Sequence, residues 1–208
     1  MKILFQGDSV TDAGRTSGAD PASSLGKGYP LFVSGYLGSR YPDKGFEVVN
    51  RGISGNRIVD LYGRWKADAL NLRPDLISIL VGVNDTWHER ASQNGVEPER
   101  FERVYRELLA WTLKTLPEVK LVLCEPFMLP FGAAGDDWVD EMKERDAIVR
   151  DLSLEFGALF VPFQHAIDDA AGRAEGSHWL LDGVHPTCSG HAILADAWLE
   201  AVASLLEI

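Results

Sequence analysis

A serine near the N-terminus has the setting that an acyl-transfer nucleophile requires. Ser9 lies in the stretch 7–12, Gly-Asp-Ser-Val-Thr-Asp, directly after the short apolar run 2–6. We interpret that run as a buried strand, and Gly7 lets the backbone turn sharply where the strand ends. A serine at this point has its hydroxyl at the carboxyl edge of a sheet and its amide near a positive helix end. The alternative is a turn that uses Ser or Asp only as a helix N-cap.

An aspartate and a histidine near the C-terminus could complete the chemistry of this serine. Asp182 and His185 are three residues apart in the sequence Asp-Gly-Val-His-Pro. On a turn, this spacing lets the carboxylate accept the Nδ1 proton of His185, which leaves Nε2 free to take the Ser9 proton. A plain turn and a metal site are the alternatives, and His178 and His191 are the close candidates for further metal ligands. We favour a Ser-His-Asp triad that needs no metal and no other cofactor.

Two further positions could supply hydrogen-bond donors to an oxyanion. Gly55 offers a backbone amide that a ligand can approach with no side chain in the way, and Asn84 offers a side-chain NH₂. Together with the Ser9 amide, they would place three donors around one oxygen. Gly52 competes with Gly55 for this role. The simpler interpretation is that the glycine is conformational and that the asparagine forms a turn.

The order of the elements explains how such distant residues can meet. Apolar runs that predict strands and helically spaced segments alternate along the chain. The predicted strands cover 2–6, 46–50, 76–81, 119–124 and 159–161, and the predicted helices cover 29–40, 58–72, 98–116, 138–156, 163–171 and 191–206. This alternation predicts a parallel sheet with helices on both faces. The carboxyl ends of parallel strands face one crevice, so all the residues above can converge there.

We expect residues 1–208 to form one domain, because no linker or repeat divides them. Residues 12–28 are rich in Gly, Ser and Ala, and we predict a long loop that forms a wall of the substrate site. Loops of this length in compact domains are usually functional. A solvated surface loop is the alternative.

Composition narrows the classes of partner. The chain has 208 residues, 46% of them hydrophobic, with a net charge of −11. This charge argues against nucleic acid and anionic membranes, both of which attract basic surfaces. Cys124 and Cys188 are the only cysteines, and neither requires an oxidising compartment. We find no secretory signal and no run of about 20 apolar residues, so we expect a cytoplasmic protein.

Four sequence blocks resemble those of the SGNH/GDSL hydrolase superfamily, in the right order over nearly the whole chain. They are Gly-Asp-Ser at 7–9, Ile-Ser-Gly-Asn at 53–56, Gly-Val-Asn-Asp at 82–85 and Asp-x-x-His at 182–185. The Gly-x-Ser-x-Gly elbow of ordinary α/β-hydrolases is absent. The stretches 7–15, 50–56 and 83–87 look like a narrower group, the intracellular acetylxylan esterases.

The resemblance implies a three-layer α/β/α sandwich of flavodoxin-like type around a central parallel five-stranded sheet. It implies Ser9 as nucleophile, His185 as base and Asp182 as the residue that orients it. It also implies an oxyanion hole made by the Ser9 amide, Gly55 and Asn84. Within the narrower group, the substrate would be a small acylated carbohydrate such as an acetylated xylo-oligosaccharide.

Other functions stay open. Trp87 and Trp179 could line the crevice and stack on a sugar ring, or could belong to the core. The superfamily also hosts thioesterases and lysophospholipases, and a non-catalytic flavodoxin-like domain could bind phosphate at the 7–9 turn. That last interpretation leaves Asp182 and His185 without a role. The sequence does not decide between a monomer and a homo-oligomer.

Overall fold

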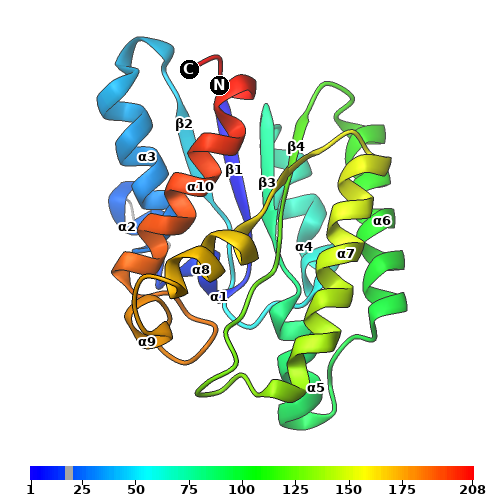
Figure 1. The fold of residues 1–208 in the computed structure, drawn as a ribbon. Helices are drawn as coiled ribbons and strands as arrows, with labels where there is room; N and C mark the ends of the chain where they lie inside the picture. The colour runs from blue at the N-terminus through cyan, green and yellow to red at the C-terminus, as the bar shows by residue number, and fades with distance from the viewer. Residues whose placement is uncertain (17–20) are drawn as a thin grey trace.

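A five-stranded parallel sheet forms the centre of the molecule (Figure 1). The structure is a computed structural model that describes residues 1–16 and 21–208. The strands are β1 (Lys2–Gly7), β2 (Glu47–Asn50), β3 (Leu76–Leu80), β4 (Lys120–Cys124) and β5 (Leu159–Val161). Their spatial order is β2-β1-β3-β4-β5, and every neighbouring pair is parallel. This is the flavodoxin-like order, which confirms the predicted fold class.

Helices follow the strands along the described chain. They are α1 (Ser9–Asp12), α2 (Pro21–Leu25), α3 (Tyr29–Arg40), α4 (Ile58–Asp68), α5 (Val83–Ser92), α6 (Pro98–Thr115), α7 (Val139–Glu155), α8 (Phe163–Ala171), α9 (Gly176–Trp179) and α10 (Cys188–Leu206). Single 3₁₀ turns lie at Pro42–Lys44, Leu70–Leu72 and Asp136–Trp138. Figure 1 shows α3, α8 and α10 on one face of the sheet and α4, α6 and α7 on the other.

Alternate residues of the strands supply the two halves of the core. On β1, Ile3 and Phe5 pack with α3, α8 and α10, whereas Leu4 packs with α4, α6 and α7. Successive strand side chains point to opposite faces, so strands covered on both sides are mostly apolar, as β3 is at every position except Ser78. Buried tryptophans anchor both layers with hydrogen bonds: Trp198 Nε1 donates to Ser78 Oγ at 2.9 Å and Trp65 Nε1 to Thr112 Oγ1 at 2.8 Å.

Several predicted boundaries are wrong. The helix predicted over 58–72 ends at Asp68, and a 3₁₀ turn follows it. The last helix begins at Cys188 instead of residue 191, because Thr187 caps it by accepting the Gly190 N–H at 3.1 Å. Helix α5 was not predicted at all. Within the predicted loop 12–28, residues 21–25 form α2, and residues 17–20 lie outside the described part of the chain.

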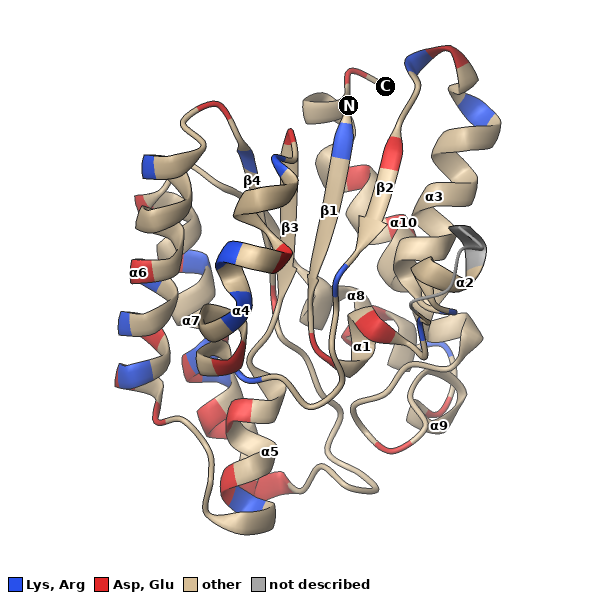
Figure 2. Cartoon of the chain, turned by 180° about the vertical axis from the view of Figure 1, so that it is seen from behind, with Lys and Arg blue, Asp and Glu red and all other residues tan. Residues whose placement is uncertain are grey.

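Charged residues of both signs are interspersed on the outer helices. Figure 2 shows acidic and basic positions side by side on α4, α6 and α7. Several of them form ion pairs, for example Arg106 with Glu102 and Glu155. None of the helices in the described ranges combines the length and apolar character that crossing a bilayer requires.

Candidate active site

The sheet reverses its winding between β1 and β3, and the candidate site lies at this point. The chain passes from β1 outward to β2, then crosses back to β3 on the other side of β1. In open parallel sheets of this order, ligands bind at the carboxyl ends of the two strands that flank the reversal. Ser9 begins α1 directly after β1, and Asn84 lies in the first turn of α5 directly after β3.

Ser9, His185 and Asp182 form a continuous hydrogen-bonded chain. Ser9 Oγ lies 2.8 Å from His185 Nε2, and His185 Nδ1 lies 2.8 Å from Asp182 Oδ2. All three side chains are partly exposed, so the chain of hydrogen bonds opens to the crevice surface. The structure therefore brings together residues that are 176 positions apart, in the arrangement predicted from the sequence.

A tight turn holds Asp182 and His185 in place. Asp182 Oδ1 accepts the backbone N–H groups of His185 at 2.8 Å and Val184 at 3.1 Å. Gly183 has a φ of +90° and its Cβ position would lie 2.3 Å from the Phe131 carbonyl oxygen, so the turn requires glycine there. The loop that carries Phe131 also stabilises the turn, because the Leu129 N–H donates to the Gly183 carbonyl at 2.8 Å.

These hydrogen bonds keep the Asp182 carboxylate charged. Partial burial acts to raise its pKa, but the N–H groups of His185 and Val184 and the His185 imidazole outweigh that effect. The pKa of Asp182 therefore lies below its ordinary value. A charged carboxylate can orient the imidazole and stabilise it when it gains a proton.

The predicted oxyanion donors come from the segments that follow β1, β2 and β3. The Ser9 amide begins α1, whose N-cap Asp8 accepts the Val10 N–H at 3.0 Å. Asn84 Nδ2 donates to the Asn56 carbonyl at 3.2 Å, which places Asn84 next to the Gly55 loop. Gly55 has a φ of +81°, a conformation that favours glycine.

Gly52, the competitor of Gly55, has a structural role in this loop. Its amide donates to Asn50 Oδ1 at 2.8 Å, so that N–H is already used. Its Cβ position would lie 2.5 Å from the Asp12 backbone nitrogen, so the tight approach of the two loops requires glycine.

Two buried carboxyl groups, Asp8 and Asp85, are the sequence neighbours of Ser9 and Asn84. Burial raises the pKa of Asp8 to about 7, against the Val10 N–H, His185 and Asn84, which lower it. Burial also raises the pKa of Asp85 to about 7, and the Arg145 charge and the Ile58 N–H oppose this. Asp85 accepts the Ile58 N–H at 3.1 Å and so joins the start of α5 to the start of α4.

Known proteins share both this fold and the sequence. The sequence model of the GDSL-like Lipase/Acylhydrolase family matches residues 5–193. The chain belongs to the GDSL-like lipase/acylhydrolase family. It is 36% identical to the "Acetylxylan esterase" of Geobacillus stearothermophilus over 97% of this chain and 93% of that protein.

Solved structures of similar proteins superpose closely on this chain. Axe2, an acetylxylan esterase from Geobacillus stearothermophilus, has a TM-score of 0.89 at 34% identity, over 97% of this chain and 93% of the other. A protein from Parabacteroides merdae described as a GDSL-like lipase has a TM-score of 0.93 at 41% identity, over 97% and 95%. Two further Axe2 structures are described as catalytic mutants, with a histidine or a serine replaced by alanine. Family and similarity together make this chain a carboxylic ester hydrolase.

The two tryptophans predicted at the site of this GDSL-like hydrolase have different surroundings. The Trp87 ring lies edge-on to His185 with ring centres 5.6 Å apart, and also packs on Trp138 at 5.4 Å. Trp179 is only 8% exposed and belongs to the core beneath α8 and α10. A role for either in substrate binding stays a prediction, and the position of Trp87 supports it more directly.

An apolar cluster adjoins His185. It contains Val83, Met128, Ala134, Trp138, Met142 and Val184, with Trp87 packed against it. Val184, which directly precedes His185, and Met128 both belong to this cluster. Phe127 instead packs on Phe163 in the core of the α8 and α10 layer.

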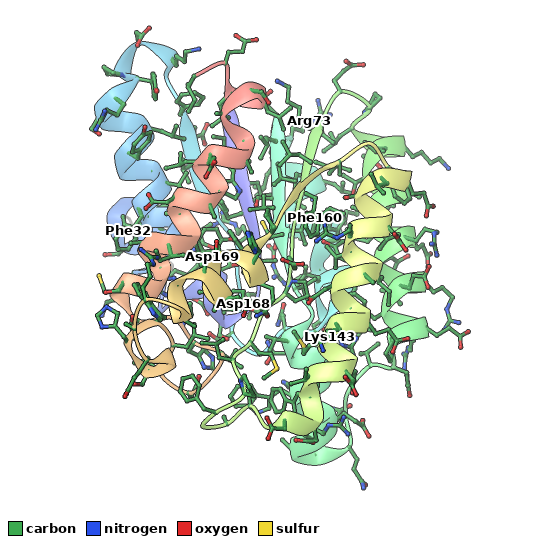
Figure 3. All side chains as sticks on the ribbon, in the orientation of Figure 1. Phe32, Arg73, Lys143, Phe160, Asp168 and Asp169 are labelled. Carbon is green, nitrogen blue, oxygen red and sulfur yellow. The ribbon has the colours of Figure 1, made fainter. Side chains whose placement is uncertain are left out.

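Two hollows in the surface do not include the triad residues. A groove of about 840 Å³ lies at the amino ends of the strands, with Arg73 on its wall (Figure 3). A second hollow, of about 210 Å³, has Lys143 of α7 and Asp168 of α8 on its rim (Figure 3). Neither is lined by Ser9 or His185.

The described residues contain no cluster of three or more His, Cys, Asp or Glu arranged to hold a metal ion. His191, considered above as a ligand, is buried and accepts the Tyr29 N–H through Nδ1 at 3.2 Å. Burial lowers its pKa to about 4. It therefore acts as a neutral acceptor that joins α10 to the start of α3.

Sequence reasoning assigned no role to several residues that support the site. Asp12 accepts both the N–H and the Oγ–H of Ser54, next to Gly55, at 2.9 and 2.8 Å. Arg145 is fully buried and donates to Thr86 Oγ1, two residues after Asn84, at 2.9 Å. The Asp at the end of the 7–12 stretch was a usable signal, but the Arg145 contact depends on a residue pairing that the sequence pattern does not contain.

Proposed function

We propose that this GDSL-like hydrolase removes acetyl groups from acetylated carbohydrates such as xylo-oligosaccharides. The Ser9–His185–Asp182 hydrogen-bonded chain is the observation that carries the proposal. The similar esterase from Geobacillus stearothermophilus is named for acetylxylan. Its catalytic mutants replace a serine and a histidine, the residue types of Ser9 and His185.

The reaction follows from the geometry of the three side chains. Ser9 Oγ attacks the ester carbonyl carbon while its proton passes to His185 Nε2, and the carbonyl electron pair moves onto oxygen. The Ser9 and Gly55 amides and the Asn84 NH₂ stabilise that oxyanion. When the tetrahedral intermediate collapses, His185 gives the proton to the departing sugar oxygen, and the acetyl group stays on Ser9.

Water completes the cycle by the same steps. His185 Nε2 takes a proton from water as the water oxygen attacks the acetyl-Ser9 carbonyl. Collapse of the second intermediate releases acetate and returns the proton to Ser9 Oγ. Throughout, Asp182 holds the Nδ1 proton of His185, which selects the tautomer with a free Nε2.

The preference for a short acyl group rests on the residues beside the triad. Trp87 and Val184 bring the apolar cluster up to His185, and Trp138, Met142 and Met128 are buried members of the same cluster. A close-packed wall of this kind leaves room for a methyl group more readily than for a long chain.

A rate series across acyl lengths tests the proposal. We expect kcat/KM to fall steeply from acetyl to butyryl to octanoyl aryl esters, and we expect release of acetate from acetylated xylo-oligosaccharides. A profile that rises with chain length would contradict the proposal and favour a thioesterase- or lysophospholipase-type activity. The series should include Ser9→Ala protein as the blank for hydrolysis that does not use the site.

A further inference from the structure

One arginine of α4 joins the segments on which the proposed oxyanion hole is built. Arg64 Nε donates to Asn56 Oδ1 at 2.7 Å, Nη1 to the Arg51 carbonyl at 2.8 Å and Nη2 to the Gly7 carbonyl at 3.2 Å. Nη1 also pairs with Asp68 at 3.2 Å. The Arg64 side chain is only 15% exposed. All three guanidinium nitrogens are therefore used inside the protein.

The acceptors of Arg64 lie on two segments, the end of β1 just before Ser9 and the loop 51–56 that carries Gly55. Gly7 ends β1 and lies two residues before Ser9, while Arg51 and Asn56 bound the loop that carries Gly55. The Gly7 carbonyl also accepts the Ile53 N–H at 3.0 Å. The Gly7 carbonyl therefore joins the end of β1 to the loop 51–56, and Arg64 forms hydrogen bonds with both segments.

Asn56 connects Arg64 to both of the donors that lie outside α1. Its side-chain oxygen accepts from Arg64, and its carbonyl oxygen accepts from Asn84 Nδ2 at 3.2 Å. Its backbone nitrogen is bonded to Gly55, so a shift of Asn56 moves the Gly55 peptide. A rigid Asn56 therefore fixes the Gly55 amide and the Asn84 side chain together.

We propose that Arg64 is a positioning residue of the oxyanion hole, which acts through Asn56 to hold Gly55 and Asn84 at a fixed place relative to Ser9. This inference rests on the proposed function, because it assigns the hole to those three residues. Arg64 touches no reacting atom. Its effect lies in the preorganisation of the donors, on which oxyanion stabilisation depends.

Arginine suits this position better than lysine. The guanidinium is planar and presents several donors in a fixed fork, whereas an ammonium group is a compact charge on a flexible stem. Arg64 uses that fork to contact a side-chain oxygen and two backbone carbonyls in different directions. A lysine could keep the charge near Asp68, but it could not keep all of these contacts.

The first test compares Arg64→Met, Arg64→Lys and Asn56→Ala on an aryl acetate. We expect kcat to fall by about 10- to 100-fold in Arg64→Met, with KM within about twofold, because a small misplacement of catalytic groups has effects of this size. Arg64→Lys should lie between Arg64→Met and the wild type. Asn56→Ala removes a single side-chain contact and should reproduce most of the kcat loss in a protein that folds. Arg106→Met, which removes a partly exposed arginine from α6, is the matched control and should keep the wild-type kcat.

The second test separates positioning from general stabilisation. Replacement of the proposed donor Asn84 by alanine should itself lower kcat by about 10²–10³-fold. If Arg64 acts on that donor, the kcat loss caused by Arg64→Met should be at least about threefold smaller in the Asn84→Ala background. A loss of equal size in both backgrounds, or a wild-type kcat in folded Arg64→Met and Asn56→Ala, would overturn the inference.

Labelling of Ser9 distinguishes this inference from the proposed function. A fluorophosphonate should modify Ser9 in the wild-type protein and, more slowly, in folded Arg64→Met. Labelling at equal rates would count against the role of Arg64 and leave the triad intact. A wild-type protein that is not labelled at Ser9 would instead contradict the proposed function itself.

Discussion

At the scale of single residues, the two carboxylate oxygens of Asp182 have separate roles. Oδ1 accepts the N–H groups of the turn, and Oδ2 faces His185 Nδ1. The first is a structural role that any acceptor can fill. The second requires a charge, because it selects a histidine tautomer and stabilises the imidazolium that forms.

Asp182→Asn should separate these two roles. The amide oxygen can still accept the turn N–H groups, so we expect the fold to remain, but an NH₂ opposite Nδ1 favours the wrong tautomer. In serine proteases the corresponding change costs about 10⁴ in kcat, and we expect a large loss of the same kind here. The measurement is kcat on an aryl acetate together with the thermal midpoint. A small loss of stability with an unchanged kcat would show that Asp182 only caps the turn.

At the scale of elements, α5 is a helix that the local sequence pattern does not predict. Its first turn, Asn84-Asp85-Thr86, consists of residues with weak helix propensity. Tertiary contacts compensate, since Asp85 accepts the Ile58 N–H and Thr86 donates to Glu141 at 2.9 Å. These partners come from α4 and α7, so the local sequence does not reveal them.

Arg145 of α7 should be critical for this packing of α5. It is fully buried and donates to Thr86, to the Val96 carbonyl and to Glu141. Arg145→Met removes this donor from the Thr86 hydroxyl and the Val96 carbonyl, while Glu141 keeps its hydrogen bonds from Thr86 and Arg90. Loss of one partner from a buried ion pair costs about 3–5 kcal/mol. We expect a loss near the lower end of that range, because Glu141 is 19% exposed.

Urea unfolding checks this expectation for Arg145→Met. Glu141→Gln keeps a hydrogen-bond acceptor for Arg145 and should cost less than Arg145→Met. An unfolding free energy equal to that of the wild type in Arg145→Met would show that α5 is held by its apolar contacts alone.

The fold was predictable because apolar runs give the strands, and parallel strands bring the segments that follow β1, β2 and β3 to one edge. The 182–185 turn follows α9 and not a strand. Its place next to Ser9 was therefore predicted from the residue types in Asp-x-x-His and not from the order of the strands. The supporting residues were not predictable. Arg64 donates mainly to backbone carbonyls of distant segments, and every residue type has a carbonyl, so such contacts leave no pattern in the sequence.

At the scale of the whole molecule, buried titratable groups make stability depend on pH. Burial raises the pKa of Asp8 and Asp85 to about 7 and that of Asp146 to about 8, from a reference of 3.8. Such groups bind protons more tightly in the folded protein, so stability falls as pH rises from about 4 to 8. His191 has the opposite effect, because its pKa is lowered from 6.5 to about 4. Its contribution to the stability of the protein is lost as pH falls from about 6.5 to about 4.

Three carboxyl groups oppose one imidazole, so we expect the thermal midpoint to fall between about pH 5.5 and pH 8.5. The net charge of −11 acts in the same direction through self-repulsion. Calorimetry across this range is the measurement. A midpoint that rises steadily to pH 8.5 would contradict the assignment of buried, protonated carboxyl groups.

Asp146→Asn isolates one of these carboxyl groups. Asp146 Oδ1 is buried with no hydrogen-bond partner in the described residues, and an amide there resembles the protonated acid. We expect the variant to match the wild type near pH 5.5 and to exceed its thermal midpoint near pH 9, where the wild type must bury a charge. Asp136→Asn, at an exposed position, should have no such pH-dependent effect.

The role of Ser9 as the nucleophile is tested most directly by the Ser9→Ala variant. In the wild-type protein the Oγ of Ser9 lies 2.8 Å from His185 Nε2. No other group in our mechanism can form the acetyl-enzyme. The measurement is kcat for hydrolysis of an aryl acetate by folded Ser9→Ala protein. We predict a loss on the order of 10⁶, as for the serine of other triads, with an unchanged thermal midpoint. Near-normal turnover by the folded variant would show that Ser9 is not the nucleophile.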